Sequence, residues 1–336
     1  MYHHQSKSKR LLRRGALMLG WFVLACMVCW ASMAIFYSDL PAGIRPLAAA
    51  LFAIGSLTAF VMVRPYSRPV LGFLVVFAAL LTWWLRIPPS NFRDWQPDVA
   101  VLPQVAMEGD QVTIRNIRNV DYRSETDYTV RHYDATFDLK KLRSVDNYLV
   151  YWGSPAIAHT MMSFGFSDGR YLCFSIETRK RQGQKYSSIK GFFKQYEITY
   201  VIADERDVVR LRTNYRQEDV YLFRLKTSKE LRTRVFLDYL REVNRLRDRP
   251  LWYNALTNNC SANIRGHTAP YNPRGKWDWR IIANGYVDEF MYEQGVLDRS
   301  LSLSQLKRRS HINSKAKAAG NAADFSTRIR EGLPGF

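Results

Sequence analysis

Cys260 lies in a sequence context that favours an activated thiol. It follows Asn258 and Asn259, either of which suits the cap position of a helix that begins at the cysteine. The unpaired amide groups of a helix N-terminus stabilise an anion, so a thiol placed there tends toward the nucleophilic thiolate. Such a thiolate needs a base nearby, and the base needs an orienting partner. The chemistry indicated is covalent catalysis by a cysteine.

His159 and Glu177 are the candidates for the base and its partner. A hairpin predicted over residues 157–178 places them on adjacent strands. A three-residue loop that ends in a left-handed glycine lets the apolar faces meet and pairs Phe164 with Leu172. In the same register His159 lies opposite Glu177, on the other face of the hairpin. A shift of one residue would separate the two side chains, so their pairing depends on this register.

Each of these three residues also has a purely structural interpretation. Cys260 could be a small buried apolar residue, or it could form a disulfide with Cys173, the other cysteine after the apolar N-terminal region. His159 could be a strand histidine satisfied by hydrogen bonds, and Glu177 a surface carboxylate paired with the basic residues that follow it. His267 lies two turns beyond Cys260 and could reach the thiol only if the predicted helix broke at the preceding glycine.

The acidic run of residues 204–207 suggests a metal site at first sight. The arginine inside the run, and Arg210 and Arg212 after it, favour ion pairs instead. The sequence contains no Walker phosphate-binding loop, no HExxH metalloprotease motif and no CxxC cluster. We therefore expect no metal and no cofactor.

Short β-rich stretches alternate between residues 111 and 225. They cover residues 111–117, 128–139, 148–152, 157–166, 171–176, 197–203 and 220–225. Residues 228–247 are predicted to form an amphipathic helix capped by Ser228, and a second helix begins near Cys260. The expected fold class is α+β, with an antiparallel sheet and a helix that carries the nucleophile.

Three apolar runs before residue 86 predict transmembrane helices. Residues 15–37 are 23 residues without a charge, residues 46–63 are 18 long, and residues 70–85 are 16 long and end in aromatic residues that suit the headgroup level. A cleaved signal peptide is the alternative for the first run. Its length and the two runs that follow favour a membrane anchor.

Basic residues in the short loops predict the orientation. Five Lys and Arg precede the first span and two lie between the second and third, whereas residues 38–45 carry one Asp and one Arg. Both basic segments therefore belong in the cytoplasm. We expect a three-helix anchor over residues 1–86, an extended proline-rich linker over residues 87–103 and a periplasmic domain over residues 104–336. The protein would then be a multi-pass protein of the inner, cytoplasmic membrane.

Residues 87–336 are basic, with 40 Lys and Arg against 29 Asp and Glu, a net charge of about +11. Nucleic acid is not expected as a partner outside the membrane. The charge favours contact with the headgroups of an anionic phospholipid bilayer. An ordinary solvated basic surface would carry the same charge.

Several uncommon stretches of the outer domain occur together in one order. They are Ala158-His-Thr-Met-Met-Ser-Phe-Gly-Phe, Phe174-Ser-Ile-Glu-Thr-Arg, Ala203-Asp-Glu-Arg-Asp-Val, Trp252-Tyr-Asn-Ala-Leu-Thr-Asn-Asn-Cys and Phe325-Ser-Thr-Arg-Ile-Arg-Glu-Gly-Leu-Pro. With these stretches, residues 90–336 resemble the Lnb N-terminal periplasmic domain family. That family is similar to permuted papain-like thiol enzymes of the lecithin:retinol acyltransferase (LRAT) type, and its better-understood relatives are bacterial lipoprotein N-acyltransferases.

The resemblance implies that Cys260 is the nucleophile and His159 its base, while Glu177 as orienting residue rests on the hairpin geometry alone. It implies a membrane-anchored periplasmic cysteine acyltransferase that moves an acyl chain from a phospholipid through a thioester, with a lipoprotein N-terminus as acceptor. A thiol peptidase or amidase that acts on cell-wall peptides is the alternative enzyme. A non-catalytic envelope scaffold is the third interpretation. The three N-terminal spans depart from the family pattern.

Overall fold

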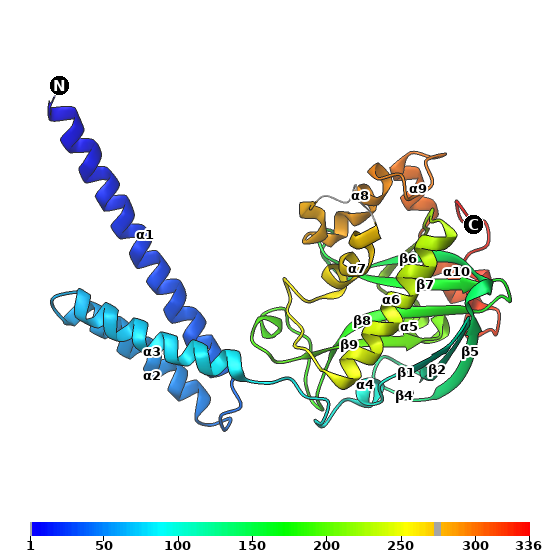
Figure 1. Ribbon diagram of the computed structural model, residues 1–336, viewed down its shortest axis with the longest axis horizontal. Coiled ribbons are helices and arrows are strands. Elements are labelled where there is room, and N and C mark those ends of the chain that lie inside the picture. The colour runs from blue at the N-terminus through cyan, green and yellow to red at the C-terminus, as the bar shows by residue number, and fades with distance from the viewer. Residues whose placement is uncertain (1, 272–276) are drawn as a thin grey trace. The chain divides into compact units, whose positions relative to one another are not determined.

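The computed structural model describes residues 2–271 and 277–336 (Figure 1). Contacts between residues divide the chain into two compact units. The first consists of Met1–Pro88 together with Phe193–Gln195, and the second of Pro89–Phe192 and Tyr196–Phe336. Each unit has its own apolar core.

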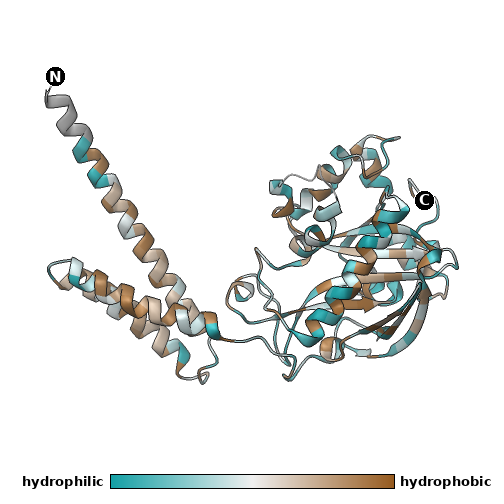
Figure 2. Ribbon diagram, in the orientation of Figure 1, coloured by the Kyte–Doolittle hydropathy of each residue, from teal (hydrophilic) through white to brown (hydrophobic). Residues whose placement is uncertain are grey.

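Three apolar helices make up most of the first unit. They are α1 (Tyr2–Phe36), α2 (Arg45–Met62) and α3 (Ser67–Arg86). The segments Lys9–Phe36, Arg45–Met62 and Ser67–Arg86 are long and apolar enough to cross a membrane. Where the helices pack together, a small core forms around Val28, Phe60 and Phe73. Most other large apolar side chains of these helices are exposed, and the ribbons of the helices are mostly in the hydrophobic colours in Figure 2.

A mixed sheet forms the centre of the second unit. Its strands are β1 (Gln104–Glu108), β2 (Gln111–Arg118), β5 (His132–Asp138), β6 (Leu142–Tyr151), β7 (Ala158–Phe166), β8 (Tyr171–Arg179), β9 (Glu197–Ala203) and β10 (Asp219–Arg224). Their order is β1-β2-β9-β8-β7-β6-β10, with β5 paired to β2. The pairings are antiparallel except for a parallel bridge between β2 and β9. A separate two-stranded ribbon joins β3 (Asp121–Tyr122) to β4 (Tyr128–Thr129).

The hairpin of β7 and β8 has the predicted register. Phe164 lies opposite Leu172, and the Phe166 amide donates to the Arg170 carbonyl at 2.9 Å. Gly169 closes the loop with φ of +85°, a left-handed conformation that glycine adopts without strain. Met162, Phe164, Leu172, Phe174 and Ile176 therefore share one buried face.

Helices cover both faces of this sheet. On the face of Phe164 lie α6 (Lys229–Asp248), which Ser228 caps as predicted, and α7 (Cys260–Thr268). The opposite face is covered by α5 (Glu205–Arg210), the π-helical turn Leu211–Tyr215, α10 (Asn313–Ala319) and α11 (Phe325–Arg328). The shorter helices α4 (Pro97–Ala100), α8 (Val287–Glu293) and α9 (Leu303–Arg309) complete the unit. The mixed α and β content agrees with the expected class.

Residues 89–103, which the prolines suggest as an extended linker, belong to the second unit from Pro89 onward. Trp95 is buried, and the guanidinium of Arg179 lies 4.3 Å from its ring centre. The side-chain amide of Asn91 donates to the last carbonyls of α6, those of Leu246 and Arg247. These contacts hold the segment on the domain.

Strand β6 begins at Leu142, six residues before the stretch expected from the sequence. The polar residues Asp146 and Asn147 interrupt the apolar alternation there, yet both are buried. Asp146 pairs with Arg224 and with Arg330, whose Nε lies 2.9 Å from its carboxylate. Partners distant in the chain allow a carboxylate inside a strand, and a local pattern does not reveal them.

Candidate active site

Cys260 is the first residue of α7 and is half-buried. The side chain of Asn259 accepts a hydrogen bond from the Ala262 amide at 2.9 Å, which confirms a cap at the predicted position. Asn258 binds the Trp252 carbonyl at 2.7 Å and so fixes the approach of the chain to the helix. These bonds hold the thiol at the positive end of the helix dipole.

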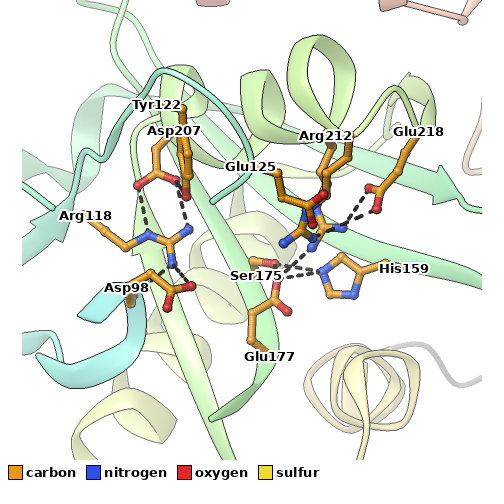
Figure 3. Close-up of polar contacts among 11 residues, drawn as sticks. Asp98, Arg118, Tyr122, Glu125, His159, Ser175, Glu177, Asp207, Arg212 and Glu218 are labelled. Carbon is orange, nitrogen blue, oxygen red and sulfur yellow. Dashed lines mark hydrogen bonds and ion pairs between the residues drawn. The ribbon is translucent and has the colours of Figure 1, made fainter. Parts of the chain in front are cut away.

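The His159 ring lies against Ser175 and Glu177 (Figure 3). Its Nε2 lies 2.7 Å from the Ser175 hydroxyl and 3.3 Å from a Glu177 carboxylate oxygen. The Ser175 hydroxyl donates to that same oxygen at 2.6 Å, so it accepts from Nε2–H. Nδ1 remains free of these partners, and Cys260 is close enough to His159 for each group to shift the pKa of the other. Hairpin and helix thus bring the three predicted residues together.

The charges of the site favour an ionised pair. Burial alone would raise the pKa of the Cys260 thiol. Interactions with His159 and the Thr160 amide outweigh this effect, so the pKa lies below its ordinary value. Burial and the Arg212 charge lower the pKa of His159, whereas Glu177 and Cys260 raise it, with a net rise to about 9. The pKa of Glu177 is held well below its usual range against burial, by His159 and Arg212. A thiolate beside an imidazolium follows from these shifts.

Arg212 is a positioning residue that the sequence did not connect with the site. It lies on the π-helical turn and donates to Glu177 at 2.8 Å and to Glu218 at 3.0 Å, as Figure 3 shows. The guanidinium is buried, and its bond to Glu177 orients that carboxylate. From the sequence we expected this arginine to form ion pairs near the acidic run. The ion pair exists, but its acidic partners are two other glutamates.

The acidic run itself forms ion pairs, as its arginines suggest. Asp207 pairs with Arg118 at 2.8 Å, and Glu205 pairs with Arg330 at 2.7 Å. In the described parts of the chain no group of three or more histidine, cysteine or acidic side chains is arranged to hold a metal ion.

Asn284 joins the two elements of the site. Its carbonyl oxygen accepts from the Ala158 amide at 2.9 Å, and its amide donates to the Ala158 carbonyl and to the Ser261 hydroxyl, each at 2.5 Å. It therefore links the start of β7, next to His159, to the start of α7. Its neighbour Gly285 lies against the backbone of residues 155–157, where a Cβ would collide with a carbonyl. No pattern in the sequence marked this residue.

His267 and Cys173, the other residues considered as partners of Cys260, have different surroundings. Helix α7 continues through residue 266, and His267 binds Asp238 and Tyr200, each at 2.7 Å. Cys173 and Cys260 are free thiols. Cys173 lies in the core on the face opposite the α7 contacts, so the sheet separates them. Burial raises the pKa of Cys173 well above its ordinary value.

An apolar cavity of about 380 Å³ lies against residues that neighbour Cys260 and His159 in the chain. Ser261 and Thr160, which follow Cys260 and His159, are among its lining residues. Most of the wall is apolar and comes from β6, β7, α6, α7 and α8, including Val145, Met162, Leu231, Val235, Ile264 and Phe290. Two buried polar atoms in the wall, Asn147 Oδ1 and Thr160 Oγ1, have no hydrogen-bond partner within the described protein. The volume falls within the range of pockets for small ligands, about 300–1,000 Å³.

Residues 128–285 match the Lnb N-terminal periplasmic domain family. This part of the chain is similar to Lnb N-terminal periplasmic domains. Cys260, His159, Glu177, Arg212 and Asn284 all lie inside it, whereas α9, α10 and α11 follow it. Searches of curated proteins and of solved structures returned no match.

Proposed function

We propose that this protein is a membrane-anchored periplasmic cysteine acyltransferase that takes an acyl chain from a phospholipid. The apolar cavity lined by Ser261 and Thr160 carries this proposal, because it offers an acyl chain an apolar site near the nucleophile. The three apolar helices would hold the domain at the inner membrane, where its donor lies. The order of a strand histidine followed by a cysteine at a helix start supports kinship with permuted papain-like, LRAT-type enzymes.

The first half-reaction transfers the acyl group to the protein. The Cys260 thiolate attacks the ester carbonyl carbon, and the Cys260 amide at the helix start donates to the developing oxyanion. The ester C–O bond breaks as the C–S bond forms. The His159 imidazolium gives its proton to the leaving alkoxide, so a lysophospholipid departs and a thioester remains. Glu177, oriented by Arg212 and Ser175, stabilises the imidazolium before this transfer.

The second half-reaction releases the acyl group to an amine. The amine nitrogen attacks the thioester, neutral His159 accepts its proton, and the C–S bond breaks to restore the thiolate and imidazolium. The N-terminal cysteine of a diacylglyceryl lipoprotein is an acceptor of this kind. Water in its place would make the protein a lipase. A cell-wall peptide is polar and suits the apolar wall less well than an acyl chain does.

The test is acylation of the full chain in vesicles that contain a phospholipid with an alkyne-tagged acyl chain. We expect label on the Cys260 peptide that neutral hydroxylamine removes, because hydroxylamine cleaves thioesters. Cys260→Ala should abolish this label and His159→Ala should reduce it strongly, whereas Cys173→Ser, a change at a buried thiol, should leave it. Label that persists in Cys260→Ala, or no label on Cys260 in the wild type, would overturn the proposal.

A further inference from the structure

Five large apolar side chains are exposed on two neighbouring segments of the second unit. Between 45% and 66% of the surface of each is accessible. We call them the indole patch: Trp152, Ile157, Trp277, Trp279 and Ile282. Exposed apolar patches of this kind mark sites of protein or membrane contact.

Hydrogen bonds hold the two segments together. The Gly285 amide donates to the Ala156 carbonyl at 3.0 Å, and the Tyr151 hydroxyl donates to the Gly285 carbonyl at 2.6 Å. The ring of Trp279 lies 5.7 Å from that of Tyr286, within the same segment. The turn that carries Trp152 and Ile157 is thus fixed against the segment that carries Trp279 and Ile282.

The indole patch adjoins the apolar cavity. Ile281, which lies between the exposed residues Trp279 and Ile282, is part of the cavity wall. Val287 and Phe290 of α8 continue the wall from the same segment. The same stretch of chain therefore contributes exposed residues to the indole patch and enclosed residues to the cavity wall.

The two charged residues within the described stretch 277–286, Asp278 and Arg280, are paired. Arg280 donates to Asp278 at 2.9 Å and to Glu293 at 2.6 Å. Paired charges oppose contact with a less polar phase less strongly than free charges do. Indole rings combine an apolar body with an N–H donor and are enriched where a bilayer meets water.

We propose that the indole patch inserts into the interfacial region of a phospholipid bilayer and brings the cavity to the lipid. The chain itself provides the reason to choose a bilayer over a protein partner, because its three apolar helices tether the domain to a membrane. The net positive charge of the outer residues favours the same partner. The inference rests on the proposed function for its purpose, namely access of an acyl chain to Cys260.

Photocross-linking of the full chain in vesicles tests the patch without requiring turnover. The photoreactive residue p-benzoylphenylalanine replaces Trp279 or Ile282, each in a Cys260→Ala background. The matched control position is Met107, which is 42% exposed on β1, at the other edge of the sheet from β10. The vesicles contain phosphatidylcholine alone or with phosphatidylglycerol, and mass spectrometry identifies the adducts.

We expect lipid adducts at positions 279 and 282 to exceed those at position 107 several-fold in both kinds of vesicle. Equal yields at all three positions would refute the proposal. Adducts that vanish in pure phosphatidylcholine would also refute it, since charge rather than the apolar patch would then hold the domain. Adducts to protein in place of lipid would do the same. Because the variants lack the thiol, a failure of the proposed acyl transfer leaves this readout unchanged.

Discussion

The pKa values of Cys260 and His159 are shifted in opposite directions, which favours a proton on the histidine rather than on the cysteine. The cysteine has a lowered pKa and ionises above it, while the histidine has a pKa of about 9 and stays protonated below it. The ion pair therefore exists in the pH window between these two values. Raising the pH through about 9 removes the imidazolium, and lowering it through the cysteine pKa removes the thiolate.

Alkylation of Cys260 by iodoacetamide should report this window. In the detergent-solubilised full chain we expect the alkylation rate to rise with pH and to reach a plateau before about pH 9. His159→Ala should lower the rate near neutral pH by about tenfold or more, because an ordinary thiol is only a few per cent ionised there. His311→Ala, at a half-exposed histidine paired with Asp219, is the control and should leave the rate unchanged. An unchanged rate in His159→Ala would exclude the ion pair.

Arg212→Gln removes a buried cation from between two glutamates. The loss of one partner from such a cluster should lower the free energy of unfolding by about 3–5 kcal/mol, measured by denaturant titration in detergent. Because the Arg212 charge lowers the pKa of His159, that pKa should also rise, as followed by NMR titration of the ring.

Two further variants separate charge from general damage at this position. Arg212→Lys keeps the charge without the planar fork, so the pKa of His159 should stay close to its wild-type value. Arg123→Gln breaks an exposed pair with Asp127 away from this cluster and should leave the free energy of unfolding nearly unchanged. A His159 pKa that does not rise in Arg212→Gln would show that the arginine has only a structural role.

At the scale of elements, the site depends on how closely the segment around Asn284 approaches β7. Gly285→Ala would place a methyl group against the Pro155 carbonyl, so the segment must move. We expect a loss of about 1–3 kcal/mol of stability. Movement of Asn284 would loosen its bonds to Ala158 and Ser261, and Cys260 alkylation should slow.

Gly266→Ala is the matched control for that substitution. This glycine lies inside α7, where an added Cβ meets no atom within 4 Å. Alanine favours the helix by up to about 1 kcal/mol, so the melting temperature should stay or rise. If both glycine variants behaved alike, the close approach at Gly285 would not be what holds the segment.

At the scale of the whole molecule, the proposed topology places the two ends of α1 on opposite sides of a membrane. Met107→Cys should react with a membrane-impermeant maleimide in cells whose outer membrane is permeabilised, because the domain would face the periplasm. Lys9→Cys should react only after the inner membrane is also opened. Both variants need a background without Cys26, Cys29 and Cys260. Labelling of Lys9→Cys in cells with an intact inner membrane would show that the N-terminus faces the periplasm, which is the opposite orientation.

Local patterns in the sequence were sufficient for elements whose signal is local. Apolar runs predicted the three long helices, alternation predicted most strands, and Ser228 and Asn259 marked two helix starts that the structure confirms. The hairpin register followed from a loop length and two apolar faces, and it was enough to bring His159 to Glu177. Burial on one face specifies register strongly, because a shift by one residue would turn every side chain over.

The rest depended on contacts between residues far apart in the chain. Arg212 meets Glu177 across 35 positions, and Asn284 meets Ala158 across 126, so no local period or spacing marks either. The cavity likewise arises only where α6, α7 and α8 meet two strands. The sequence by itself determined which groups could react and which helices could span a membrane. Tertiary packing decided which charges surround the thiol, because the pKa of a buried group depends on its neighbours in space.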